Sequence, residues 1–390
     1  MDFKNQNNYP LIYEFNGCQV EIKSDLKPGN ISLNKNTIFI NTQPLAIWQE
    51  GSAYHSIVTP FKTFTTLEET ANAAVIALDG RELSQMQEGR VGRLPQGLPD
   101  LNNPGPVRIR KNILNMSQDE RDLFIQAILA LKNNVNNITF RSLYDDFVKV
   151  HMDTFTNHDW SAHENILLPW HRIFIYHFES LLCAQPEFES VTVPYWDWTQ
   201  VAQRDVLPFT DNFMGTTGKE DDDTGTQEVL DGPFAHTKGN WNIVPDSDWN
   251  PITWLMRAKS SNLFGQPMVE PAILSETLAR ENFAFPDAAG EGFGYNLNKK
   301  LHDEVHNDVG GAMGSSASPN DPIFWLHHCM LDKIWADWQE LYPNSKYVNE
   351  PEYHPSFDPD TTPIQPWLDD INRHITINDI FNYKRLFIYE

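Results

Sequence analysis

The stretches LHDEVH (301–306) and DPIFWLHHCMLDKIWADWQEL (321–341) decide how this chain is interpreted. In the first, His302 and His306 lie four residues apart, which places both side chains on one face of a helix, one turn from each other. In the second, apolar residues recur at helical spacing and predict an inward-facing helix that carries two adjacent histidines. A buried imidazole needs a partner, because an unpaired buried polar group costs about 1–3 kcal/mol. A metal ion shared by the two helices would be such a partner.

Histidine is concentrated in two windows of the sequence. Nine of the 13 histidines lie within residues 151–177 and 302–328, where an even spread would place about two. In the first window, His151 ends a predicted helix, His163 lies in a predicted loop and His171 begins the next helix. With three histidines in each region and no carboxylate or thiolate among the obvious donors, the set indicates copper or zinc. Structural zinc sites usually contain cysteine, and a zinc protease would need Glu directly after the first histidine, where this chain has an aspartate.

Composition and charge exclude several classes of protein. The 390 residues include 12 Trp and 23 Phe, which are too many for a disordered chain. A net charge of −24 opposes binding to nucleic acid or to anionic membranes, and no apolar run reaches the roughly 18 residues that a membrane-spanning helix needs. Three cysteines are too few for a disulfide scaffold and suit a reducing compartment. Because the N-terminus also lacks a basic region followed by an apolar stretch, we expect a cytoplasmic protein; the sequence indicates no oligomeric state.

The first 100 residues differ from the rest of the chain. Short alternating stretches at 18–23 and 36–42 predict strands, and the Pro- and Gly-rich stretch 94–107 predicts a linker. We therefore expect a strand-rich N-terminal extension over 1–100 and a main domain over 107–390. The helices predicted in the main domain lie at residues 117–131, 144–151, 171–182, 298–306 and 322–341.

Three segments of the main domain resemble the type 3 copper family, which comprises tyrosinases, catechol oxidases and other polyphenol oxidases, and the oxygen-carrying units of molluscan haemocyanins. HENILLPWHRIFIYHFE (163–179) is similar to the copper A signature of the family, and VTVPYWDWT (191–199) to its P-Y-W-D-W segment. DPIFWLHHCMLD (321–332) resembles the copper B pattern D-P-x-F-x(3)-H-x(3)-D. This resemblance, which covers about residues 107–390, implies a mainly α fold. A central four-helix bundle would hold a dicopper site among long irregular loops, and a strand-containing extension would precede it.

The resemblance also implies a set of six histidine ligands. The ligands of copper A would be His151, His163 and His171, and those of copper B would be His302, His306 and His328. The loop between the second and third copper A ligands is one residue shorter than is usual in the family, and His158 is the competing second ligand. A thioether to the second ligand is not expected, because Ser161 stands where some family members have cysteine. His177 is expected at the surface or beside the ligands, and His327 beside them.

With two copper ions and O2, the resemblance implies an enzyme that hydroxylates small monophenols at the ortho position and oxidises o-diphenols to o-quinones. Glu291 and Asp303 are then expected to hold the water that takes the phenol proton, unless both are ordinary surface charges. Phe324 would pack over the copper pair, Asn307 would form a wall of the substrate pocket, and the small Ser315 would leave that pocket open. The alternatives are a catechol oxidase or an o-aminophenol oxidase without monophenolase activity, or a haemocyanin-like O2 carrier.

The two ends of the chain carry further expectations. The family often pairs an arginine near the start of the domain with a C-terminal tyrosine motif, so Arg108 or Arg110 is expected to contact FIYE (387–390). Many relatives carry a further domain that covers the site. In this chain, we expect any such lid or shield to come from residues 1–100.

Overall fold

We analysed the protein as a computed structural model. The structure describes residues 9–23, 34–50, 53–56, 59–78, 101, 103–135, 142–157, 166–202, 206–216, 226–239, 241–244, 253–258, 264–283, 291–347, 360–361, 364, 366–367 and 374–390.

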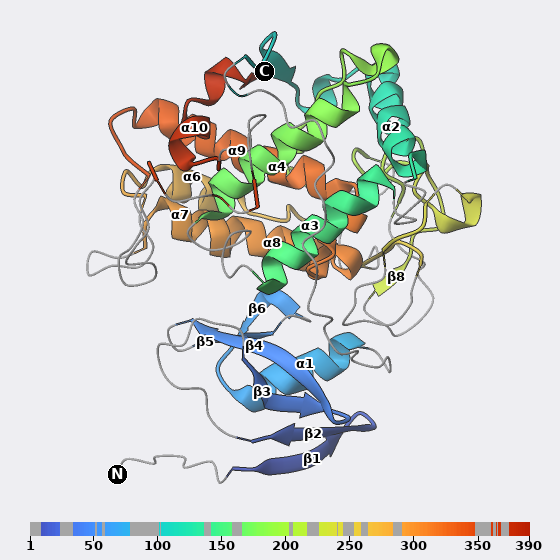
Figure 1. The fold of residues 1–390 in the computed structure, drawn as a ribbon, viewed down its shortest axis with the longest axis vertical. Helices are drawn as coiled ribbons and strands as arrows, with labels where there is room; N and C mark the ends of the chain where they lie inside the picture. The colour runs from blue at the N-terminus through green and yellow to red at the C-terminus, as the bar shows by residue number, and fades with distance from the viewer. Residues whose placement is uncertain are drawn as a thin grey trace. The chain divides into compact units, whose positions relative to one another are not determined.

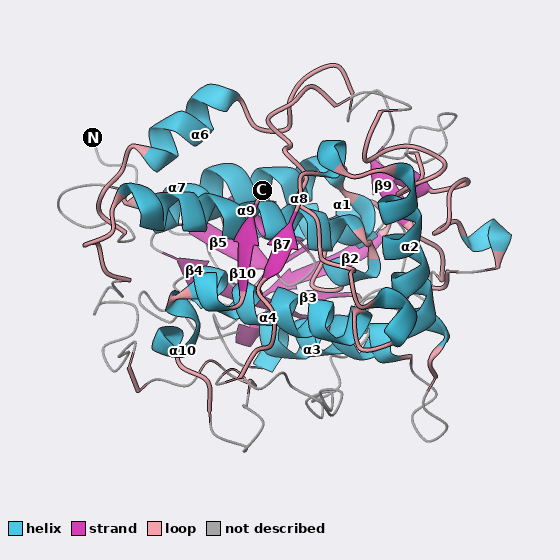
Figure 2. Cartoon of the chain, turned by 90° about the horizontal axis from the view of Figure 1, so that it is seen from above, coloured by secondary structure: helices cyan, strands magenta, loops and turns pink. Residues whose placement is uncertain are grey.

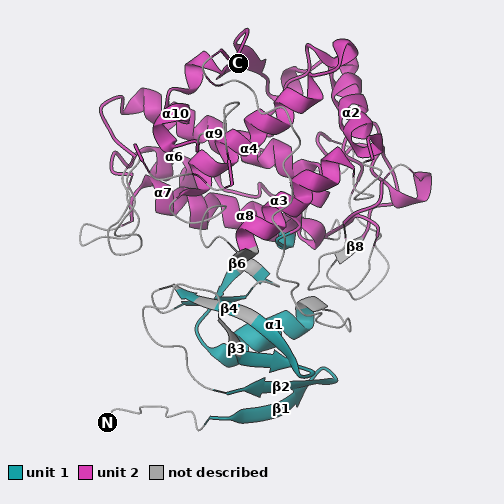
Figure 3. Ribbon diagram, viewed as in Figure 1, with its two compact units in different colours: residues 1–90, 245–252, 314–316 teal, residues 91–244, 253–313, 317–390 magenta. Residues whose placement is uncertain are grey.

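The chain divides into two compact units (Figure 3). Unit 1 contains residues 1–90, 245–252 and 314–316, and unit 2 contains residues 91–244, 253–313 and 317–390. Much of the predicted linker lies outside the described residues, so a domain boundary between residues 100 and 107 stays a prediction.

Unit 1 is built on a six-stranded antiparallel sheet in which each strand pairs with the next along the chain. The strands are β1 (Leu11–Phe15), β2 (Cys18–Ile22), β3 (Asn34–Ile40), β4 (Gln43–Glu50), β5 (Ala53–Ser56) and β6 (Thr59–Phe64), and helix α1 (Leu67–Leu78) follows. The predicted strands are confirmed by β2 and β3. Asn41 and Thr42 both have positive φ, which suits the tight turn between β3 and β4. Alternation along the strands buries one apolar side of the sheet, against which α1 packs.

Helices dominate unit 2, and this confirms the mainly α fold (Figures 1 and 2). The helices are α2 (Gln118–Asn133), α3 (Leu143–Asn157), α4 (Leu167–Leu182), α6 (Pro271–Leu278), α7 (Phe293–Asn296), α8 (Asp303–Val309), α9 (Ile323–Leu341) and α10 (Ile377–Phe381). In the central bundle, α3, α4, α8 and α9 lie close together, and α4 packs along α9 (Figure 1). None of the helices within the described ranges is both long and apolar enough to cross a membrane.

Local sequence explains where these helices begin and end. Ser117 caps α2 through the predicted capping box, because its hydroxyl accepts from the Glu120 N–H while the Glu120 carboxylate accepts from the Ser117 N–H. Helix α4 begins four residues earlier than predicted, since Pro169 falls in its first turn, where proline is tolerated. The predicted helix over 298–306 is instead a π-helix, η5 (Leu297–His302), that continues into α8.

Two short ladders tie distant parts of unit 2 together. Strand β7 (Arg108–Arg110) pairs in parallel with β10 (Phe387–Tyr389), and β8 (Thr226–Glu228) pairs with β9 (Met256–Ala258). The first ladder joins the beginning of the helical unit to the end of the chain. Short 3₁₀ helices cover Ile113–Asn115, Pro186–Phe188, His236–Lys238, Gly311–Gly314, Ser318–Asn320 and Tyr383–Arg385.

Candidate metal centre

The histidines of η5, α8 and α9 converge at the centre of unit 2. His302, His306, His327 and His328 are all buried, and one ring nitrogen from each lies within 4.8 Å of the others. The Nε2 atoms of His306 and His328 are 3.1 Å apart. The His171 ring of α4 stacks on His328, with ring centroids 3.9 Å apart and planes within 9°. Helices α4 and α9 and the continuous segment formed by η5 and α8 therefore place imidazoles at one point.

The remaining described histidine of the predicted set, His151, lies beside this group. Its ring centroid is 5.7 Å from that of His171. Phe324 lies among the histidines, because its ring centroid is 5.2 Å from His151, 5.8 Å from His171 and 4.1 Å from His328. The structure thus brings together five of the six predicted ligands and the predicted aromatic neighbour. His163, its competitor His158 and Ser161 lie outside the described residues.

Main-chain oxygens fix the orientation of two of these rings. The Nδ1 atom of His171 is 2.9 Å from the Leu167 carbonyl, and that of His306 is 2.7 Å from the Met313 carbonyl. A carbonyl oxygen can only accept, so in both rings Nδ1 carries the hydrogen and Nε2 of the neutral ring offers a lone pair. This is the arrangement in which histidine binds metals. The Nε2 atoms of His306 and His328 are 3.1 Å apart, and two lone pairs at that distance repel each other. A proton or a cation must therefore lie between them.

A carboxylate performs the same task for His302. The Nδ1 atom of His302 lies 2.9 Å from Oδ1 of Asp303, whose other oxygen is 3.7 Å from Nζ of Lys299. Asp303 therefore contacts a predicted ligand directly, a contact that the helical spacing of the sequence does not indicate. Carboxylate contacts of this kind raise the basicity of a ligating imidazole and hold its ring in place.

Burial favours the neutral form of His302, His171 and His328. Desolvation lowers the pKa of His302, although Asp303 opposes the shift. Desolvation, together with the neighbouring imidazoles, holds the pKa values of His171 and His328 well below the ordinary value. Neutral imidazole is the form that binds a metal ion.

The donor chemistry fits copper. The thiol nearest in sequence, Cys329, donates to the Val193 carbonyl at 3.3 Å, and burial raises its pKa, so it is not a thiolate donor. The described donors of the cluster are therefore neutral imidazole nitrogens, a set that suits copper among the common metals.

The structure places the predicted residues for proton transfer and substrate binding as follows. The Glu291 carboxylate forms an ion pair with Lys300 at 2.7 Å, and its side chain is 40% exposed. Between Glu291 and His302 lies the π-helix η5. Asn307 is half-buried on α8, and Ser315 is buried and belongs to unit 1. The structure does not bring Glu291 and Asp303 into a shared contact among the interactions of the described residues.

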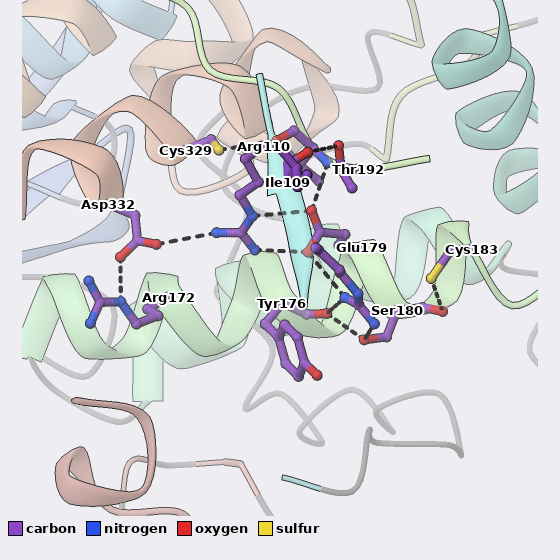
Figure 4. Close-up of polar contacts among 12 residues, drawn as sticks. Ile109, Arg110, Arg172, Tyr176, Glu179, Ser180, Cys183, Thr192, Cys329 and Asp332 are labelled. Atoms are coloured by element: carbon purple, nitrogen blue, oxygen red, sulfur yellow. Dashed lines mark hydrogen bonds and ion pairs between the residues drawn. The ribbon is translucent and has the colours of Figure 1, made fainter. Parts of the chain in front are cut away.

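A buried ionic network joins α4 to α9 (Figure 4). Asp332, one turn after His328 on α9, accepts from Nε of Arg172 at 2.5 Å and from Nη1 of Arg110 at 3.2 Å. Arg110 also donates two hydrogen bonds of 3.1 Å to Glu179 of α4. Burial alone would raise the pKa of Glu179, but Arg110 and Arg108 hold it below its ordinary value. Because Arg172 directly follows His171, the network links both helices close to their histidines.

The same network shows which of the two arginine side chains, Arg108 or Arg110, contacts the C-terminal tyrosine motif. Arg110 donates to the hydroxyl of Tyr389 at 3.2 Å, and that hydroxyl donates to Asp332 at 2.6 Å. Arg108 instead binds Glu179 and Ser180. The copper B motif contains Asp332 but does not indicate its partners, which come from segments up to 222 residues away.

His177 is fully buried on α4 and packs against Phe147 and Trp367. Burial lowers its pKa to about 3. It contacts aromatic residues rather than the histidine cluster.

Comparisons with known proteins agree on one family. The family model of the common central domain of tyrosinase matches residues 141–341. The chain is 34% identical over 285 residues to a tyrosinase of Streptomyces antibioticus, covering 70% of this chain and 100% of that protein. It is 30% identical over 329 residues to grixazone synthase of Streptomyces griseus, covering 73% of this chain and 99% of that protein. Among solved structures, a tyrosinase from Burkholderia thailandensis superposes with a TM-score of 0.52 at 16% identity, covering 73% of this chain and 74% of that one, which is a likeness of fold.

Proposed function

The chain belongs to the tyrosinase family of dicopper oxidoreductases, and we propose that it hydroxylates monophenols at the ortho position and oxidises o-diphenols to o-quinones with O2. The observation that carries this proposal is the convergence of buried histidines from α3, α4, η5, α8 and α9. Several imidazole nitrogens gathered at one buried point are the kind of donor set that a metal centre requires.

The proposed ligands of the two copper ions are two sets of three histidines. They are His151, His163 and His171 for copper A, and His302, His306 and His328 for copper B. When bound, the two ions supply O2 binding and the electron transfer of the reaction. The protein's own contribution begins with Leu167, Met313 and Asp303, whose oxygens hold three of the rings in the tautomer that presents Nε2.

Phe324 gives the site its apolar character. Its ring contacts His151, His171 and His328 and is itself fully buried, so it keeps water out of the space between the two ligand groups. We propose that a phenol ring docks with its hydroxyl towards the histidines and with Asn307 as part of the pocket wall. In a dry pocket, the orientation of the bound phenol contributes strongly to rate.

Deprotonation of the phenol needs a base, and we propose Glu291 with a water molecule for this step. To take that role, the Glu291 carboxylate must exchange its contact with Lys300 for the water. Asp303 acts in the same proposal through His302: its carboxylate holds the Nδ1 hydrogen and so increases the donor strength of the ring.

Oxygen uptake by the copper-loaded protein tests this function. Tyrosine, a catechol and an o-aminophenol are supplied separately, and o-quinone formation is followed by absorbance. We expect uptake and colour with tyrosine and with the catechol. Turnover of the catechol or the o-aminophenol alone would restrict the activity to those substrates, and reversible O2 binding without turnover of any of them would identify an oxygen carrier.

A further inference from the structure

His327 has the properties of a metal donor although the copper B pattern selects its neighbour His328. It is fully buried on α9, and its ring stacks on His302 with centroids 5.6 Å apart and planes within 19°. It meets His306 edge-on at 4.9 Å. One of its ring nitrogens lies within 4.8 Å of a ring nitrogen on each of the other three cluster histidines. By position alone, His327 belongs to the cluster as much as the three proposed ligands do.

The protein itself does little to bind the His327 ring. The His302 main-chain carbonyl faces the ring, but neither ring nitrogen reaches hydrogen-bond geometry with a described residue. A phenylalanine would fill similar space without burying two polar nitrogens. His177 also lacks hydrogen-bond partners among the described residues, so His327 is distinguished by its place beside three proposed ligands. A second ion-binding state of the cluster would use the nitrogen of His327 as a donor.

On the basis of the dicopper site proposed above, we propose that His327 is a fourth imidazole donor of copper B, which binds the ion during loading. His327 offers its nitrogen to an incoming ion before the final set of His302, His306 and His328 is complete. Since all four donor atoms lie within 4.8 Å of one another, one ligand can replace another with little movement of the backbone. The final set of ligands contains His328 rather than His327, so His327 does not bind copper once loading is complete.

The test compares copper uptake by four variants and the wild-type protein in the copper-free state. In His327→Phe the donor is removed at similar volume, and in His327→Gln it is replaced by a weak donor that keeps a polar side chain. His327→Met restores a donor, because a thioether binds Cu(I). His177→Phe is the matched control, since His177 is equally buried and neither of its ring nitrogens has a hydrogen-bond partner among the described residues, yet it contacts Phe147 and Trp367.

Uptake is followed anaerobically by the loss of colour of the Cu(I)–bicinchoninate complex, and bound copper is counted at the end. We expect His327→Phe and His327→Gln to load about tenfold more slowly, at the lower end of effects seen around metal sites, and to reach two copper ions per chain. His327→Met and His177→Phe should load at nearly the wild-type rate. Circular dichroism of each copper-free variant verifies the fold, and His327→Gln carries the test if the phenylalanine variant does not fold.

Two results would overturn the proposal. Wild-type loading rates in both His327→Phe and His327→Gln would show that the His327 side chain only packs. A final content of one copper ion per chain in these variants would show that His327 is a permanent ligand. Failure of the wild-type protein to bind two copper ions would instead contradict the dicopper function itself, so the two failures are distinguishable.

Discussion

Replacing Asp332 by asparagine should destabilise the protein strongly while changing almost no volume. The carboxylate is 2% exposed and lies between two fully buried guanidinium groups, those of Arg172 and Arg110. Removing one charge of a buried ion pair lowers the free energy of unfolding by about 3–5 kcal/mol, because the other charge stays buried without compensation. Arg110 keeps its two hydrogen bonds to Glu179, so we expect the lower end, about 3 kcal/mol.

Asp337→Asn is the matched control for that experiment, with the same substitution on the same helix. Its ion pair with Lys333 is 2.7 Å long, but the Asp337 side chain is 43% exposed, so its loss should cost only about 0.2–0.5 kcal/mol. Urea unfolding of the copper-free proteins, followed by near-ultraviolet circular dichroism, gives both free energies of unfolding. If Asp332→Asn cost no more than Asp337→Asn, the buried network would not be what holds α4 against α9.

Three further substitutions test the buried histidine of α4, the contact between Asp303 and His302, and the proton-transfer step. His177 has a folded pKa of about 3 and an ordinary pKa of about 6.5 when unfolded, so the unfolded state takes up the proton and stability falls as pH drops below 6.5. Between pH 7 and 5 the wild-type protein should lose about 2 kcal/mol more unfolding free energy than His177→Phe, and equal losses in urea titrations would contradict the assignment. Asp303→Asn should weaken copper retention about 10–100-fold in chelator competition, whereas unchanged affinity would mean that the contact with His302 does not matter for the metal. Glu291→Gln should lower monophenol turnover more than catechol turnover, and equal losses on both substrates would remove Glu291 from the proton-transfer step.

Spacing patterns predict the helices and most of the candidate site. The four-residue interval between His302 and His306 and the apolar spacing around His328 each indicate one face of a helix, and the structure brings these faces together. Alternating residues predict β2 and β3 in the same way. These patterns succeed because they are local: each depends on the periodicity of a single element.

What the sequence does not indicate depends on contacts between distant segments. The π-helix over Leu297–His302 has no spacing signal of its own, since it changes the phase of one helix without a Gly or Pro to mark it. The charged side chains of Arg172, Glu179 and Asp332 would usually be assigned to a helix surface, yet they are buried because each finds an opposite charge on another element. Asp303 contacts His302 through a side-chain rotamer, which residue identity alone does not determine.

The most direct test of the central claim is anomalous X-ray scattering at the copper edge from crystals of the copper-loaded protein. We expect two peaks, one beside His151 and His171 and one among His302, His306 and His328. A single peak, or two peaks away from these histidines, would contradict it.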